Sequence, residues 1–104
     1  MSREHERTPD GRWIVVDGRR WRAEDPALPA DAAERLRSHL GRARSAVRLA
    51  KSDRDRDAAR ERVQLAKEGL GERGDAWWDL TEADRAARAE ERLATLDELA
   101  PPAS

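Results

Sequence analysis

The pattern of hydrophobic and polar positions changes in residues 12–23, where β-branched and aromatic residues stand among arginines. These residue types favour β-strands, in which successive side chains point to opposite faces, and here the runs WIVV and RRWRA flank Asp17 and Gly18. An Asp-Gly pair favours a type I′ turn, which needs a positive φ at both central positions. The pattern therefore predicts a β-hairpin in which a two-residue turn pairs Ile14 with Trp21. The other expected partners are Val16 with Arg19 and Arg12 with Ala23.

The two faces of this hairpin carry different side chains. Ile14, Val16 and Trp21 project to one side, which is the more apolar and is taken as the core face. Trp13 projects to the other side among arginines, in a position suited to cation–π contacts. We therefore expect Trp21 in the core and Trp13 partly exposed.

Elsewhere, apolar residues recur at steps of three and four, which is typical of helices with one buried stripe. The expected helices cover about residues 31–51, 56–70 and 81–99. Charged residues interrupt the stripe near residues 52–55, where we expect a turn that makes the first two helices an antiparallel pair. One continuous helix is the alternative. Thr81 is suited to cap the third helix, because threonine is a favoured N-cap residue.

These elements predict a mainly α protein with a small β-hairpin, an α+β fold. The two-stranded hairpin packs on the antiparallel helical pair, and an acidic C-terminal helix follows. Residues 11–99 are expected to form a single small domain between a disordered tail at 1–10 and a short tail at 100–104. A hairpin alone is marginally stable, so we expect it to pack near Trp77 and Trp78, one of them in the core and the other more exposed.

Composition narrows the class of protein further. The chain has 104 residues, of which 38% are hydrophobic, and its 21 basic and 22 acidic residues nearly cancel to a net charge of −1. This balance argues against a general nucleic-acid coat protein, which needs a strong basic excess. Cysteine is absent, which excludes disulfides and thiolate metal ligands. No apolar run could span a bilayer and no signal sequence is visible, so we expect a cytoplasmic protein without membrane contact.

Sequence patterns for catalysis are weak. GLGERG at residues 69–74 fits the spacing G-x-G-x-x-G, but it follows a helix and does not connect a strand to one. The acidic run at 53–57 lacks the glycine and the glutamate that a calcium loop needs at its sixth and twelfth positions. His5 lies in the expected tail, and His39 has no acid one turn away on its helix, so a solvated or rim histidine is expected. We therefore expect no enzyme, no catalytic residue, no metal and no cofactor.

The hairpin carries the candidate recognition residues, which are Trp13, Arg20, Arg22, Arg19 and Arg12. Arginine binds carboxylates and phosphates, and an exposed tryptophan can anchor a protein or stack on a base. These residues could equally hold the hairpin together. The favoured function is a non-enzymatic protein-interaction module, whose partner is another protein or a second copy of the chain. A nucleic-acid-binding accessory domain is the alternative, and an enzyme acting on a small arginine-bound anion is a third.

Three stretches also carry a resemblance to a known family: GRWIVVDGRRWRAEDPALP at 11–29, ARSAVR at 43–48 and RVQLAKEGLGERGDAWW at 62–78. Together they resemble a small bacterial family of about this size, some members of which are labelled biopolymer transporter Tol. The resemblance spans residues 11–78 and implies a shared fold unit, but it implies no chemistry. The acidic helix after residue 78 lies outside the family pattern.

Overall fold

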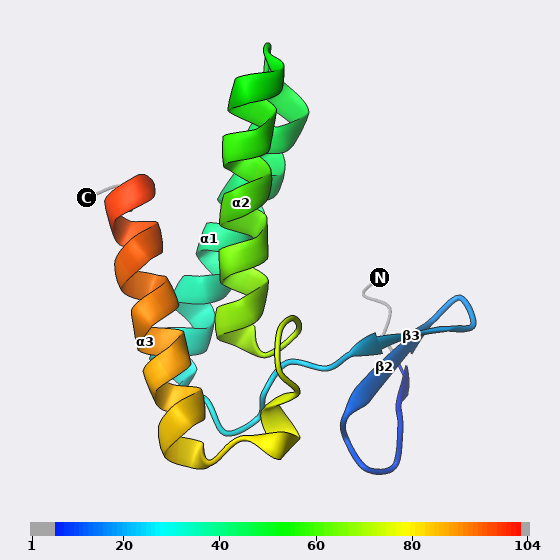
Figure 1. Ribbon diagram of the computed structural model, residues 1–104. Coiled ribbons are helices and arrows are strands. Elements are labelled where there is room, and N and C mark those ends of the chain that lie inside the picture. The colour runs from blue at the N-terminus through cyan, green and yellow to red at the C-terminus, as the bar shows by residue number, and fades with distance from the viewer. Residues whose placement is uncertain (1–5, 103–104) are drawn as a thin grey trace.

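The computed structural model describes residues 6–102 and shows a mainly α protein with a small antiparallel sheet (Figure 1). This is the predicted fold class. The elements in chain order are β1 (Glu6–Arg7), β2 (Trp13–Val16), β3 (Arg19–Arg22), α1 (Ala30–Leu49), α2 (Asp53–Leu70), the 3-10 turn η1 (Trp77–Asp79) and α3 (Glu82–Leu99).

The hairpin forms with the predicted register. Ile14 pairs with Trp21, and the turn residues Asp17 and Gly18 have φ values of 50° and 77°, as a type I′ turn requires. The sheet has three strands and not two, because β1 pairs antiparallel with the outer edge of β2. The prediction of a disordered tail over residues 1–10 is therefore wrong from Glu6 onward. Residues 1–5 lie outside the described part of the chain, as do 103 and 104 of the expected C-terminal tail.

The helical pair breaks at residues 50–52, slightly earlier than expected. Ser52 is the N-cap of α2, and its side-chain oxygen accepts a hydrogen bond of 3.1 Å from the N–H of Asp55. This cap starts α2 at Asp53, three residues before the predicted position. The two helices lie side by side in opposite directions (Figure 1), so the alternative of one continuous helix is wrong. Thr81 caps α3 as predicted, accepting a 3.1 Å hydrogen bond from the N–H of Asp84.

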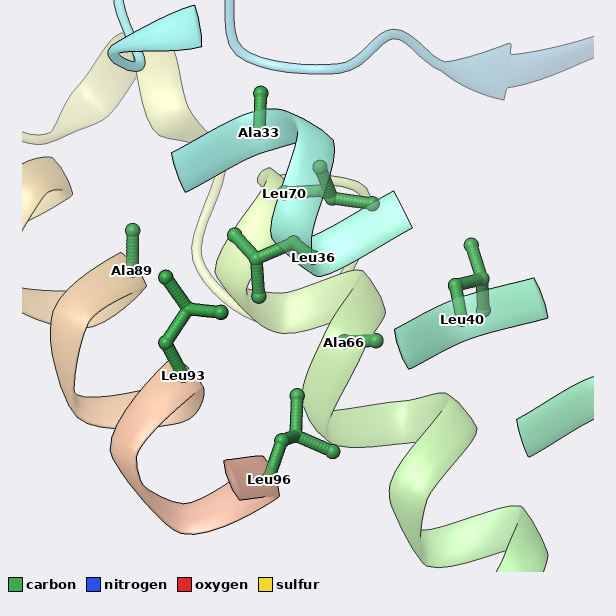
Figure 2. Close-up of a cluster of buried hydrophobic side chains, with 8 residues drawn as sticks. All are labelled: Ala33, Leu36, Leu40, Ala66, Leu70, Ala89, Leu93 and Leu96. Carbon is green, nitrogen blue, oxygen red and sulfur yellow. The ribbon is translucent and has the colours of Figure 1, made fainter. Parts of the chain in front are cut away.

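The core lies where the three helices meet (Figure 2). Leu36 of α1, Leu70 of α2 and Leu96 of α3 have no exposed surface. Gly69 allows the helices to approach closely, because a Cβ at this position would lie 2.7 Å from the Cδ2 atom of Leu36. The buried cluster consists of Ala33, Leu36, Leu40, Ala66, Leu70, Ala89, Leu93 and Leu96.

The segment between β3 and α1 ties the sheet to the helices. The N–H of Asp25 donates to the carbonyl of Leu70 at 2.9 Å, and the indole Nε1 of Trp77 donates to the carbonyl of Ala23, also at 2.9 Å. The carboxylate of Asp25 is buried and accepts two hydrogen bonds from Arg85 of α3. These contacts hold the end of β3, the end of α2 and the start of α3 together.

Candidate interaction surface

The sheet packs on the η1 turn through the face of Trp13, which is not the face that the sequence favours as the core face. Trp13 packs on Trp78, with ring centroids 5.5 Å apart, whereas Trp21 is 45% exposed. The expectation of a core Trp21 and a more exposed Trp13 is therefore wrong, although the register is correct. The reason is tertiary, because Trp78 lies beside one face and provides an aromatic partner only there. Trp77 is buried and Trp78 is half-buried, as predicted for two adjacent tryptophans.

Three of the candidate arginines lie at this junction between the sheet and the η1 turn. The guanidinium carbons of Arg12 and Arg22 lie 5.0 and 5.7 Å from the ring centroid of Trp78. The guanidinium carbon of Arg20 lies 5.9 Å from the ring of Trp13. Arg22 also donates a 2.7 Å hydrogen bond to the carbonyl of Gly74. These cation–π and hydrogen-bond contacts hold the sheet in place, so this group of residues is engaged within the protein itself.

Arg19 is separated from the other candidates, because it projects from the opposite face of the sheet. Its guanidinium carbon lies 4.6 Å from the ring centroid of the exposed Trp21. On the same face, Ile14 and Val16 are only half-buried. The structure therefore brings Arg12, Trp13 and Arg22 together at Trp78 and leaves Arg19 beside Trp21 on the open face.

The open face borders a groove of about 500 Å³, which we call the Trp21 groove. It lies between the sheet and the helical pair, and both provide its walls. Sequence reasoning missed the contributions of α1, α2 and the turn after α2, because residues far apart in the chain meet here only in the folded protein. The lining residues are Ile14, Val16, Trp21, Arg22, Arg44, Lys67 and Glu72.

Electrostatics in the Trp21 groove are dominated by cations. The pKa of Lys67 is lowered by desolvation and by the neighbouring positive charges of Arg73 and Arg44. The pKa of Glu72 is raised, chiefly because burial disfavours the carboxylate and also because Glu24 is close. Among the described residues, neither Lys67 nor Arg44 has a carboxylate oxygen within 4.0 Å. The groove therefore carries an excess of positive charge beside an apolar wall, since Arg22, Arg44 and Lys67 line it together with the single carboxyl group of Glu72.

His39 does not belong to this surface. The expectation of a solvated or rim histidine is wrong, because His39 is only 2% exposed and its Nε2 lies 2.7 Å from Oδ1 of Asp97. Arg42 lies 3.0 Å from the other ring nitrogen, and since a guanidinium only donates, that nitrogen accepts and Nε2 carries the proton. The acid comes from α3 and not from the same helix, so spacing within α1 could not show it. The hydrogen bond from His39 is the chief cause that lowers the pKa of Asp97, and the pair joins α1 to α3.

Within the described residues, histidine and acidic side chains form no group of three that could hold a metal ion. None of the helices in residues 6–102 combines the length and apolar character needed to cross a membrane.

Comparisons with known proteins found no matching family model, no matching curated protein and no matching solved structure. The resemblance to the small bacterial family therefore stays an expectation drawn from the sequence alone.

Proposed function

We propose that this chain is a small non-enzymatic protein-interaction module whose partner docks in the Trp21 groove, and that it acts in the cytoplasm. The observation that carries the proposal is a tryptophan, 45% exposed, at the wall of a groove of about 500 Å³. Tryptophan and arginine are the residues most enriched among the energetic anchors of protein interfaces. Here Trp21 and Arg19 stand together on the open face.

The apolar wall of the groove favours a protein over a nucleic acid. Ile14 and Val16 offer a contact for apolar side chains, which a phosphate backbone lacks, and Glu72 would repel phosphates. The alternative, a nucleic-acid-binding accessory domain, is supported by Arg19 lying over Trp21, since such a pair could stack on a base and bind its phosphate. The third function, an enzyme acting on a small anion, gains no support from the groove.

The protein partner can be captured by a photocrosslinking amino acid with an aromatic side chain placed at position 21, so that an aromatic ring remains at the groove wall. A matched position is 99, because Leu99 is also an exposed large apolar residue but lies at the end of α3. We expect discrete protein adducts from position 21 that are absent from position 99 and are lost when Lys67→Glu is added. Identical adducts from both positions, or adducts that persist with Lys67→Glu, would show that the groove is not the docking site.

The nucleic-acid alternative is tested by titrating labelled single- and double-stranded DNA and RNA at low and moderate salt. We expect weak binding that disappears with salt, because each neutralised phosphate of duplex DNA adds only about −0.9 to the log–log slope. Micromolar binding that survives moderate salt and is lost in Arg19→Ala/Trp21→Ala would instead make nucleic acid the ligand.

A further inference from the structure

A second apolar depression lies on the helical pair, next to the Trp21 groove. It has a volume of about 450 Å³, and its apolar lining residues are Val47 of α1 and Val63 of α2. Arg44 lines both depressions, so they form one continuous surface, which we call the basic helical face. The depression is lined by Arg44, Val47, Arg48, Arg60 and Val63.

The basic helical face lies on the side of the pair away from α3. The residues of α1 and α2 that form ion pairs with α3 are different ones: Arg35 with Asp97, and Glu68 with Arg92. In Figure 1, α3 lies on one side of the α1–α2 pair and the sheet on the other. One side of the α1–α2 pair is thus covered by α3, while no described helix packs on the other side, where the sheet lies (Figure 1).

The charge of the open side is strongly unbalanced. The cations that line the two depressions are Arg22, Arg44, Arg48, Arg60 and Lys67, whereas Glu72 is the one acidic residue among the described residues that line them. None of these cations has a carboxylate oxygen of the described residues within 4.0 Å. A bound partner that carries carboxylates would place negative charges among these cations and would replace their mutual repulsion by attraction to the partner.

We propose that the basic helical face binds an acidic amphipathic helix of a partner protein, which sets its apolar stripe on Val47 and Val63 and its carboxylates against the arginines. This inference rests on the proposed function and specifies the partner. Two packed antiparallel helices present a groove that accepts a third helix, and α3 occupies the opposite side in this way. There too an acidic residue, Asp97, reaches an arginine of α1, Arg35.

The spacing of the surface defines the partner further. Lys67 borders the Trp21 groove and Arg60 borders the valine depression, seven residues apart on α2, which corresponds to about 10 Å along the helix. Apolar residues at positions i and i+7 of a partner helix are about the same distance apart. One such helix could therefore reach Val63 with one apolar residue and the Trp21 groove with the next.

A fluorescent synthetic peptide of about 18 residues, about 27 Å long as a helix, tests the proposal. It carries leucines at i, i+3, i+7 and i+10, and glutamates and alanines elsewhere. One control peptide has the same composition with the leucines distributed around the helix, and a second is a glutamate homopolymer of equal charge. Binding is measured by fluorescence anisotropy at two salt concentrations.

Arg44→Glu/Arg60→Glu is the variant of the binding face, and Lys51→Glu/Arg54→Glu is its matched control. Both pairs change the net charge equally, but Lys51 and Arg54 lie at the tip where α1 joins α2. Arg44→Gln/Arg60→Gln serves as a milder variant, and circular dichroism verifies the fold of each protein. We expect the amphipathic peptide to bind with a dissociation constant on the order of 10 μM, weakened at least about tenfold by the face variants and little by the control.

Equal binding of the distributed or homopolymer peptide would overturn the proposal, because charge alone would then account for the affinity. Absence of saturable binding, or tighter binding of labelled RNA at the same face, would also overturn it. If position 21 captures a protein while the amphipathic peptide does not bind, the helix inference fails and the proposed function stands. If neither experiment shows a partner, both fail.

Discussion

Replacing Asp25 by alanine should remove the buried ion pair that links the segment between β3 and α1 to α3. The residue is 3% exposed, and its two carboxylate oxygens accept hydrogen bonds from Nη2 and Nε of Arg85, the latter at 2.8 Å. The N–H of Ala27 donates to the same carboxylate at 2.9 Å. Since the Arg85 side chain is only 13% exposed, Asp25→Ala would leave a buried cation without its partner.

The expected loss of free energy can be compared with the free energy of unfolding of the whole protein. Removing one partner of a buried ion pair costs about 3–5 kcal/mol, and the free energy of unfolding of a small domain is about 5–15 kcal/mol. We place Asp25→Ala near 3 kcal/mol, at the lower end, because Arg85 retains some exposure and its contact with the Trp77 ring at 5.1 Å. Asp25→Asn should cost less, since an amide oxygen can still accept from the N–H of Ala27.

The dependence on pH follows from the pKa of Asp25. Burial by itself raises this pKa, but the hydrogen bonds from Arg85 and from the N–H of Ala27 outweigh it, so the folded-state pKa is lowered. A lowered carboxyl pKa contributes stability above the unfolded value, about 3.9, and that stability is lost as the pH falls through the folded value. The wild-type protein should therefore lose stability below about pH 4 more steeply than Asp25→Ala.

Urea denaturation followed by circular dichroism at pH 7 and pH 3 measures both effects. Asp53→Ala is the matched control, because that carboxylate pairs with Arg56 but its side chain is 98% exposed. We expect its unfolding midpoint to match that of the wild type. A cost for Asp25→Ala below about 1 kcal/mol, or equal pH slopes in the variant and the wild type, would refute the reasoning.

Thermal and urea unfolding measurements test three further predictions. Gly69→Ala should destabilise the protein by about 1–3 kcal/mol because its Cβ would clash in the core. Gly41→Ala should stabilise the protein by about 0.5–1 kcal/mol, because a Cβ at this position in α1 meets no other atom within 4 Å. If the two glycine substitutions changed the free energy of unfolding in the same direction, these two predictions would be contradicted. Trp13→Ala should cost about 2–3 kcal/mol and Trp21→Ala less than about 1, whereas the reverse order would mean that the sheet packs by its other face. His39→Ala should cost about 2–4 kcal/mol through a cavity and a lost hydrogen bond, and a neutral effect would rule out its buried role.

The candidate site was only partly predictable from the sequence. The hairpin that carries the arginines and tryptophans forms where the sequence predicts it, but the exposed pair of Arg19 and Trp21 was not predicted, because Trp21 was expected in the core. Arg44 and Lys67 gave no sequence signal, because charged residues off the apolar stripe of a helix are ordinary solvent-facing positions. They became part of a surface only when the helical pair was placed beside the sheet.

The sequence by itself determined the local elements. The Asp-Gly turn with its register, the cap at Thr81 and the break near Ser52 all depend on residues within a few positions of one another. Local backbone preferences and nearby hydrogen bonds decide such features, so they can be read directly from the order of residues.

Only the tertiary structure decided which face of the sheet is buried and which groups are paired. Both faces of the hairpin carry a tryptophan, so periodicity alone could not choose between Trp13 and Trp21. Trp78, more than fifty residues away, made the choice by packing on Trp13. Asp97 likewise reached His39 from another helix. Contacts between distant segments depend on how whole elements pack, and no local pattern in the chain records that packing.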